Sequence, residues 1–515
     1  MHQSPPTPDS SRDQGAAPSA TRFRSSDWIL FLLAFAAVFA WRARGFDRTG
    51  LVHYDEGVYA VTAEAVRTGR GIAEFHPQQA LHAPPLHPWC SGTLARIAGI
   101  PAAEALRVWS LATGAAAVAL LLFGVRCSRG RAAAATGAFL AASDESLALW
   151  SRSGMTDAFF SAALVFAALT YAAAEKRRSL ALALLFGLAA GVASNVKYVG
   201  WLVVVAAAIG AAPRFANASR EDRRGMAIRL AAATVVALLC KLPYALSLAG
   251  TATDASAIAG QHDRFIDAAH WWRSFVAQCG YHALDAGVFA RAAAVLVVIA
   301  AACLPRLRRR IADDPFLATS AAAALVWFLL VPVYHPYPRL MVPLLTFAYA
   351  TTGGVIGLLG PKMRTTAMLV ALSLGSLGAA TAVKGREPSD GLARAAADIA
   401  QRIPAGRRTA VLAEPVVIAY LRDRGIAAEL LGHPWQIADD ASAETWIVSG
   451  RNVRRNGEWE AWEAARLRSA PVVFFTEAAV NDVRRLDDFL PSDARGGAAS
   501  DPTTYGLELR RVSPR

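Results

Sequence analysis

The chain has 515 residues, of which 54% are apolar and only 18% charged, and its mean hydropathy is +0.31. Soluble domains carry about 25% charged residues, so this shortfall and the long apolar runs exclude an ordinary soluble protein and indicate an integral membrane protein. The net charge of +13 comes from Lys and Arg in short loops between apolar runs, a pattern typical of a polytopic membrane protein and not of a nucleic-acid-binding one. Five widely spaced cysteines form neither a disulfide framework nor a metal-binding motif.

Residues 1–26 are rich in Ser, Pro, Ala and Gln and are predicted to form a disordered tail. The first apolar run has no small-residue cleavage pattern after it, so we predict a retained helix and not a signal peptide. Runs long enough to cross about 30 Å of hydrocarbon predict eleven transmembrane helices. They lie at about 27–44, 104–126, 131–148, 156–174, 179–195, 197–213, 227–249, 285–304, 316–334, 338–360 and 364–383.

The charges of the loops determine the orientation of these helices. Lys and Arg concentrate in every second loop if the N-terminus is cytoplasmic and if residues 86–99 do not cross the membrane. Residues 86–99 are therefore predicted to be a helix in the membrane interface. Two long outer loops follow from this arrangement, at 45–103 and 250–284. The second contains Trp272 and Val276 at helical spacing, which predicts another interfacial helix.

Residues 384–515 contain no predicted span and alternate helix-like and strand-like patterns. Helices are predicted at 390–402, 415–424 and 458–467, and strands at 409–413, 445–449 and 471–475. An odd number of spans places this small α/β domain outside the cytoplasm. The predicted fold class is therefore an α-helical polytopic membrane protein, with about eleven transmembrane helices and interfacial helices within residues 27–383, followed by a small α/β extracytoplasmic domain.

The first outer loop carries two adjacent carboxylates, Asp55 and Glu56, close to the end of the first span. One interpretation is that Asp55 opens a helix to residue 68, where its charge would stabilise the positive end of the helix dipole. Tyr59 would then lie one turn later on the same face. The other interpretation is a reactive site at the bilayer surface, where ionisable groups are costly and often functional. This motif alone leaves both interpretations open.

Four other outer segments also carry polar side chains. Each has a structural explanation: a proline turn, a helix cap, a lysine that reaches back to the interface, or an anchor in the headgroup layer. Their coincidence on one membrane face favours a functional site, because the inner loops hold little but arginine. The residues concerned are His82 in segment 81–89, Arg152 and Asp157 in segment 150–157, Lys197 between two spans, and Tyr337 and Arg339 in segment 334–339.

Such a site is suited to transferring a sugar from a polyprenyl phosphate, whose tail stays in the bilayer while its sugar and phosphate stand at the surface. The leaving phosphate is a weak base, so it needs cations and not protonation, whereas the attacking hydroxyl needs a general base. One carboxylate with Lys, Arg, His or Tyr donors meets this requirement. Glycoside hydrolysis would need two cooperating carboxyl groups and water, and it would not explain the spans.

These segments resemble motifs of the membrane-embedded GT-C glycosyltransferases, in the branch of the protein O-mannosyltransferases and of the transferase that places aminoarabinose on lipid A. The resemblance covers about residues 27–383. It rests on the acidic motif at 54–60, on Pro84-Pro85-Leu86, on the second acidic motif at 152–157, on Lys197, and on Pro338-Arg339 followed by Met341-Val342-Pro343.

The resemblance implies an inverting transfer to a lipid, glycan or protein acceptor on the outer face of the membrane, with Asp55 as general base. It implies Glu56 and Asp157 as further catalytic residues, Asp157 orienting the acceptor or the base. It also implies a set of residues that hold the donor and its phosphate: Tyr59, His82, Arg152, Lys197, Tyr337 and Arg339.

The chain departs from the family pattern where a lysine is expected before the paired prolines, because Ala83 stands there. The corresponding phosphate contact is either missing or supplied by His82 or His87. A divalent metal is compatible with His53, His82, Asp55 and Glu56, but their spacing is no ligand signature, so no metal or other cofactor is indicated.

Two other functions are compatible with a polytopic chain. A transporter or flippase for a lipid-linked saccharide would place ionisable groups near the middle of spans and would show internal repeats, and the sequence has neither. A non-catalytic scaffold would depend on residues 385–515 and not on Asp55. The alanine- and arginine-rich usage is typical of a GC-rich bacterial genome, so a multi-pass protein of the bacterial inner (plasma) membrane is expected.

Overall fold

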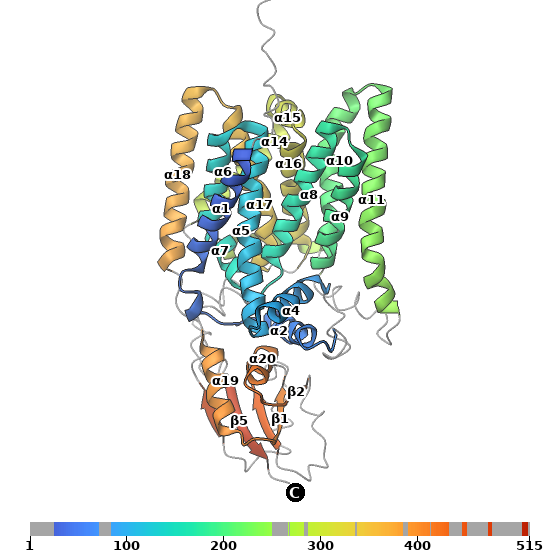
Figure 1. Ribbon diagram of the computed structural model, residues 1–515. Coiled ribbons are helices and arrows are strands. Elements are labelled where there is room, and N and C mark those ends of the chain that lie inside the picture. The colour runs from blue at the N-terminus through green and yellow to red at the C-terminus, as the bar shows by residue number, and fades with distance from the viewer. Residues whose placement is uncertain are drawn as a thin grey trace, which may run out of the picture.

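The computed structural model describes residues 25–71, 84–249, 266, 268–282, 287–334, 337–384, 390–412, 414–431, 445–450, 472–475 and 507–512. The predicted disordered tail at 1–26 lies almost entirely outside these residues, as do His82 and the helix predicted at 458–467. Figure 1 shows three tiers: a bundle of long helices, a pair of helices that lie across one end of it, and a small sheet with two helices beyond that pair.

Most helices of the bundle run roughly side by side (Figure 1). Its members are α1 (Ser25–Ala43), α5 (Ala102–Arg129), α6 (Arg131–Ser143), α7 (Glu145–Arg152), α8 (Asp157–Arg177), α9 (Leu180–Val196), α10 (Leu202–Asn217), α11 (Arg220–Ala249), α14 (Val288–Cys303), α15 (Pro305–Ala312), α16 (Pro315–Leu330), α17 (Val342–Leu358) and α18 (Pro361–Lys384). Four short 3₁₀ segments join or extend them: η1 (Phe46–Arg48), η3 (Tyr198–Trp201), η5 (Val331–Val333) and η6 (Pro338–Met341).

Small residues allow these helices to approach closely. Alanine dominates the buried positions, and at Gly187 in α9 a methyl group would collide with the backbone oxygen of Ala233 in α11. In a bilayer the lipid tails are as apolar as the side chains, so close van der Waals packing of small residues is what holds such helices together.

Eight helices among the described residues are long and apolar enough to cross a membrane, and the pair α14 and α15, bent by 91°, raises the number to nine at most. A helical polytopic membrane protein is thus confirmed, whereas eleven spans remain a prediction. Two of the predicted runs fall short. The run at 179–195 is α9, with 17 residues, and the run at 131–148 is broken at Asp144 into α6 and α7.

The break at Asp144 has a clear physical cause. Its Oδ1 accepts the N–H of Leu147, which caps α7, and its Oδ2 accepts hydrogen bonds from Arg291 Nε at 2.8 Å and from the Tyr349 hydroxyl at 2.7 Å. Asp144 is buried, and a buried carboxylate must be paired and hydrogen-bonded. Its partners come from α14 and α17, and the helix is interrupted where they meet it.

The middle tier contains α2 (Tyr54–Arg67) and α4 (Leu86–Ala98), which cross below the bundle in Figure 1. The helix α4 has 13 residues and is not among the candidate spans, as expected for residues 86–99. The second predicted interfacial helix is α13 (Trp271–His282), preceded by the short turn η4 (Ala268–His270); its Trp272 and Val276 are exposed.

The third tier is a five-stranded mixed sheet with strand order β2-β1-β3-β5-β4. The strand β1 (Arg408–Leu412) pairs in parallel with β2 (Ala428–Leu431) and β3 (Thr445–Ser449), and β5 (Leu507–Val512) runs antiparallel to β3 and to β4 (Val472–Phe475). The helices α19 (Gly391–Arg402) and α20 (Pro415–Asp423) were both predicted, whereas β2 and β5 were not. Figure 1 shows α20 on the side of the sheet that faces α2.

Candidate active site

The N-terminus of α2 is capped by His53 and Glu56 and not by Asp55. His53 is the N-cap, and its Nδ1 accepts the backbone N–H of Asp55 at 3.1 Å. Glu56 Oε2 accepts the N–H groups of Val52 and His53 at 2.8 and 2.7 Å, and its Oε1 accepts the N–H of Gly154. Both oxygens of Glu56 are thus occupied, and its side chain is buried. Burial raises the pKa of Glu56 above its usual range, although the three N–H donors oppose this shift.

The carboxylate of Asp55, in contrast, faces cationic side chains and not backbone amides. Its Oδ2 lies 2.8 Å from Nη1 of Arg339 in η6 and 4.0 Å from Nδ1 of His53, and a third of its side chain is exposed. Burial raises the pKa of this carboxyl, but the charges of Arg339, His53 and Lys197 outweigh that effect and hold the pKa below its ordinary value. The result is an ionised and accessible carboxylate.

A second ion pair lies beside the first. Asp157, the first residue of α8, is fully buried, and its Oδ1 lies 2.5 Å from Nζ of Lys197, which links α9 to η3. The other oxygen, Oδ2, is buried and has no hydrogen-bond partner among the described residues. Arg339 also contacts Met155, two residues before Asp157, at 4.0 Å, so the two pairs belong to one cluster.

Aromatic side chains surround this cluster. The Tyr59 ring packs edge-on to the His87 imidazole at 5.6 Å between ring centres. His87 is buried with Nε2 3.1 Å from the Gly154 oxygen, and burial lowers its pKa to about 4, so it is neutral at physiological pH. The Tyr337 ring lies 5.3 Å from the Arg339 guanidinium. Tyr59, His87 and Tyr337 are all buried, and electrostatic interactions are stronger in such a poorly solvated setting than in water.

Two predicted site residues, Glu56 and Arg152, do not contribute a free functional group to this cluster. Glu56 is occupied by backbone amides, as described above. The Arg152 guanidinium donates to the carbonyl oxygens of Arg44 and Gly45 at 3.2 and 3.1 Å, so it holds the turn that follows α1. His82 lies outside the described residues.

Sequence reasoning missed Lys241, near the C-terminal end of α11. Its Nζ donates to the Ser194 carbonyl at 2.5 Å and lies about 5 Å from the rings of Tyr198 and Tyr244, whose hydroxyls are 2.6 Å apart. Tyr198 follows Lys197 directly, so this cation stands next to the cluster. A signal was present, because Lys241 is the one charged residue between Arg229 and Asp254 in a long apolar run.

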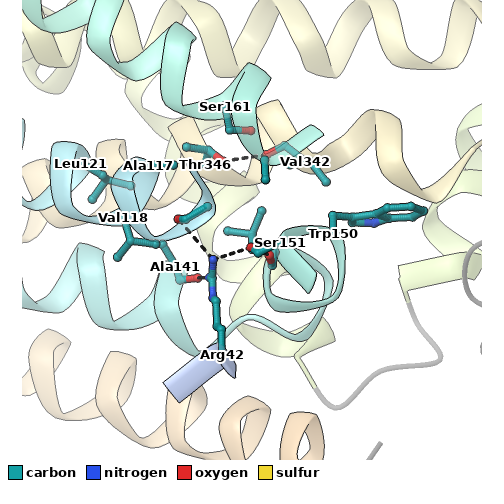
Figure 2. A pocket seen from close by; sticks show the side chains of 13 residues that line it. Arg42, Ala117, Val118, Leu121, Ala141, Trp150, Ser151, Ser161, Val342 and Thr346 are labelled. Atoms are coloured by element: carbon teal, nitrogen blue, oxygen red, sulfur yellow. Dashed lines mark hydrogen bonds between the residues drawn. The ribbon is translucent and has the colours of Figure 1, made fainter. Parts of the chain in front are cut away.

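A small cavity lies inside the bundle, away from these charges. It measures about 20 Å³, enough for about one water molecule, and Arg42, Ser151, Ser161 and Thr346 are among the residues that line it. Figure 2 shows the Arg42 guanidinium pointing at the Ser151 hydroxyl, 2.6 Å away. None of Asp55, Asp157, Lys197 and Arg339 lines this cavity, so it is separate from the candidate site.

Within the part of the chain that is described, no three His, Cys, Asp or Glu side chains gather as metal ligands.

Part of the chain matches a known family of glycosyltransferases. Residues 82–246 match the sequence profile of the dolichyl-phosphate-mannose-protein mannosyltransferases. The resemblance to the GT-C glycosyltransferases is confirmed. The match also bears out the predicted enzyme class, a membrane glycosyltransferase that depends on a polyprenyl-phosphate sugar. It covers less than half of the chain, and it contains Asp157, Lys197 and Lys241 but neither Asp55 nor Arg339.

Solved structures share the fold over most of the chain. The crystal structure of ArnT from Cupriavidus metallidurans bound to undecaprenyl phosphate is 14% identical with a TM-score of 0.62, covering 87% of this chain and 96% of that one. The oligosaccharyltransferase from Archaeoglobus fulgidus, in complex with Zn and sulfate, is 15% identical with a TM-score of 0.57, covering 84% and 69%. Curated proteins gave no match. At such low identity these likenesses establish the fold alone.

Proposed function

We propose that the protein transfers a sugar from a polyprenyl-phosphate carrier to an acceptor hydroxyl at the outer face of the membrane, with inversion and with Asp55 as general base. The observation that carries this proposal is that the neighbouring acids Asp55 and Glu56 have different partners at the start of α2. Glu56 and His53 cap the helix, so Asp55 is left ionised, partly exposed and paired with Arg339. An acid whose only role was capping would be bound to backbone amides.

The proposed reaction is a single displacement. The acceptor oxygen attacks the anomeric carbon of the sugar and gives its proton to Asp55. The bond between that carbon and the phosphate oxygen breaks, and its electron pair goes to the phosphate. Because attack and departure occur on opposite faces of the sugar, the configuration inverts.

Cations would stabilise the charge that develops on the phosphate. Arg339 and Lys197 are in place for this role, but each already faces a carboxylate, so the four charges nearly cancel. The described contacts of Lys241 are a hydrogen bond to a neutral carbonyl and the faces of two aromatic rings. Lys241 would therefore supply the additional positive charge that is missing at Ala83. ArnT from Cupriavidus metallidurans, which shares the fold, has been crystallised with undecaprenyl phosphate bound, and this supports a carrier of the same chemistry.

The remaining residues would act indirectly. Glu56 would fix the start of α2, and Asp157 would orient Lys197 or the acceptor. Tyr59 and Tyr337 would form walls of the sugar site, Arg152 would hold the loop after α1, and His82 stays a predicted donor contact.

We further propose eleven membrane crossings, a cytoplasmic N-terminus, an extracytoplasmic sheet domain and a location in a bacterial inner membrane, on the charge pattern of the loops.

The test is transfer by the purified full-length protein in lipid nanodiscs, incubated with labelled polyprenyl-phosphate sugars and an acceptor extract. Asp55→Asn should lower the rate about 10²–10⁴-fold, the usual contribution of a general base. The control is Asp47→Asn, which removes an exposed carboxylate from the same outer loop and should leave the rate unchanged. Near-normal transfer by Asp55→Asn would overturn the proposal. Movement of an intact lipid-linked sugar across the membrane, without any transfer, would instead support a flippase.

A further inference from the structure

The sheet domain touches the helix that carries the proposed base. The helix α20 packs against α2 on the side of the sheet nearest the bundle (Figure 1). At Gly57, two residues after Asp55, a methyl group would collide with the backbone of Pro415 and Val416. The two helices are therefore in backbone contact, and this contact explains why position 57 is a glycine.

A hydrogen bond ties the two elements together at the entrance to α2. The Leu51 N–H donates to the Tyr420 hydroxyl of α20 at 2.6 Å, across 369 positions of sequence. Leu51 is buried, so without Tyr420 its N–H would lose a partner that water does not readily replace. Burial raises the pKa of Tyr420 to about 12, so its hydroxyl stays protonated and neutral at physiological pH.

The Tyr420 contact completes a row of satisfied amides. Three consecutive N–H groups, those of Leu51, Val52 and His53, lead into α2, and Tyr420 takes the first while Glu56 takes the other two. Glu56 comes from α2 itself, so it shapes the turn but cannot anchor it in space. Tyr420 anchors it from outside. The carboxylate that faces Arg339 stands only two residues beyond this row.

We propose that α20 is part of the catalytic architecture and that Tyr420 is a positioning residue for Asp55. This inference rests on the proposed function, because it assumes that Asp55 is the general base. It gives the sheet domain a defined role: the domain holds the N-terminus of α2 at the distance from η6 that the Asp55–Arg339 pair requires. A displacement of about 1 Å at a reacting group can cost about a hundredfold in rate, so even a small loosening should be measurable.

The main test is Tyr420→Phe in the full-length protein, assayed in nanodiscs with a labelled polyprenyl-phosphate sugar. The ring and its packing remain, and only the hydroxyl is lost. We expect kcat to fall about 10- to 100-fold with an unchanged KM for the donor. The acid limb of the rate profile should move to higher pH, because a looser Asp55–Arg339 pair protonates more readily. The matched control is Tyr171→Phe, which removes a hydroxyl hydrogen-bonded to Arg214 and should change neither kcat nor the acid limb.

A second variant approaches the same contact from α2. Gly57→Ala should push α20 away and reproduce the loss of kcat, whereas Gly225→Ala, where a methyl group would meet only the end of the Arg229 side chain, should be neutral. Folding of each variant is checked by thermal unfolding and gel filtration. If Tyr420→Phe proves unfolded, Gly57→Ala decides the question alone.

The outcomes separate the two proposals. Tyr420→Phe should cause no further loss in an Asp55→Asn background if Tyr420 acts through Asp55, because effects of residues that act as a unit are not additive. Wild-type kcat and pH profile in a folded Tyr420→Phe or Gly57→Ala protein, with Asp55→Asn inactive, would overturn the positioning role alone. An active Asp55→Asn protein would overturn the base assignment and the positioning role together.

Discussion

At the scale of single residues, the site depends on how two neighbouring carboxylates are used differently. Glu56 is buried and accepts three backbone N–H groups, whereas Asp55 is partly exposed and faces a guanidinium. Environment therefore separates their roles, although they stand side by side in the chain. Arg339 keeps Asp55 ionised. In the proposed reaction the donor phosphate would bind the same guanidinium and so weaken its pairing with Asp55. Binding of the donor would thus make Asp55 a stronger base at the moment when the acceptor must lose its proton.

The pH dependence of transfer tests this pairing. Arg339 is the strongest of the charges that lower the pKa of Asp55, so Arg339→Gln should raise that pKa. A base works when deprotonated, and a higher pKa means protonation at a higher pH. The acid limb of kcat/KM should therefore move to higher pH, in a profile measured from about pH 4 to pH 8. Arg308→Gln, an exposed arginine of α15, is the control. An unshifted limb in Arg339→Gln would contradict the assignment.

At the scale of elements, α2 is the part of the molecule where several others converge. Its start is held by its own capping box, by the Gly154 amide between α7 and α8, and by Tyr420 of α20. Isolated helices of this length are marginal in water, so α2 owes its position to these contacts and not to its own propensity. Two short segments complete the site: η6 carries Arg339, and the junction of α9 and η3 carries Lys197.

Glu56→Gln tests the cap independently of catalysis. A glutamine side chain presents an NH₂ group where one of the backbone N–H donors needs an acceptor, so at least one buried donor loses its partner. We expect the free energy of unfolding to fall by about 1–3 kcal/mol, seen as a lower melting temperature of the purified protein. Glu64→Gln in the same helix removes only the pair with Arg67, near the protein surface, and should cost less than about 1 kcal/mol. Equal melting temperatures for the two variants would show that Glu56 is not needed for the cap.

At the scale of the whole molecule, the proposed orientation places the candidate site and the sheet domain on the same side of the membrane. In Figure 1 the middle tier lies between the bundle and the sheet, and its helix α2 carries Asp55. A lipid-linked donor in the bilayer and an acceptor in the outer space would meet at this level. The sheet domain is then part of the boundary of the site.

Two native cysteines provide a test of the orientation. Cys279 in α13 and Cys303 at the end of α14 are both exposed, and the helix α14 separates them. A variant that keeps only Cys279 should react with a membrane-impermeant maleimide in intact spheroplasts, because that side is predicted to be outside. A variant that keeps only Cys303 should react only after permeabilisation. Reversed labelling would invert the proposed topology.

Most of the fold was predictable because membrane helices are long and apolar, so one local property identifies them. The exceptions are instructive. Asp144 breaks a predicted span because α14 and α17 bring Arg291 and Tyr349 to it. The strand β5 escaped prediction because its Glu508 and Arg510 are charged residues that become buried when they pair with each other between β3 and β4. In both cases a distant partner changes what the local pattern favours.

The amino-acid sequence was enough to show that the chain is a polytopic membrane protein, that most of its charged residues lie between the predicted spans, and that its motifs resemble those of a lipid-phosphate-dependent glycosyltransferase. The first two conclusions follow from composition and from the length of the apolar runs, and the resemblance rests on short motifs, so none of the three requires contacts between distant residues. The three-dimensional structure was needed to show which of two adjacent acids caps α2, which cation faces Asp55, and that Tyr420 reaches the start of α2. The partners of Asp55 and Leu51 lie 284 and 369 positions away, and such pairings exist only once the bundle and the sheet have packed.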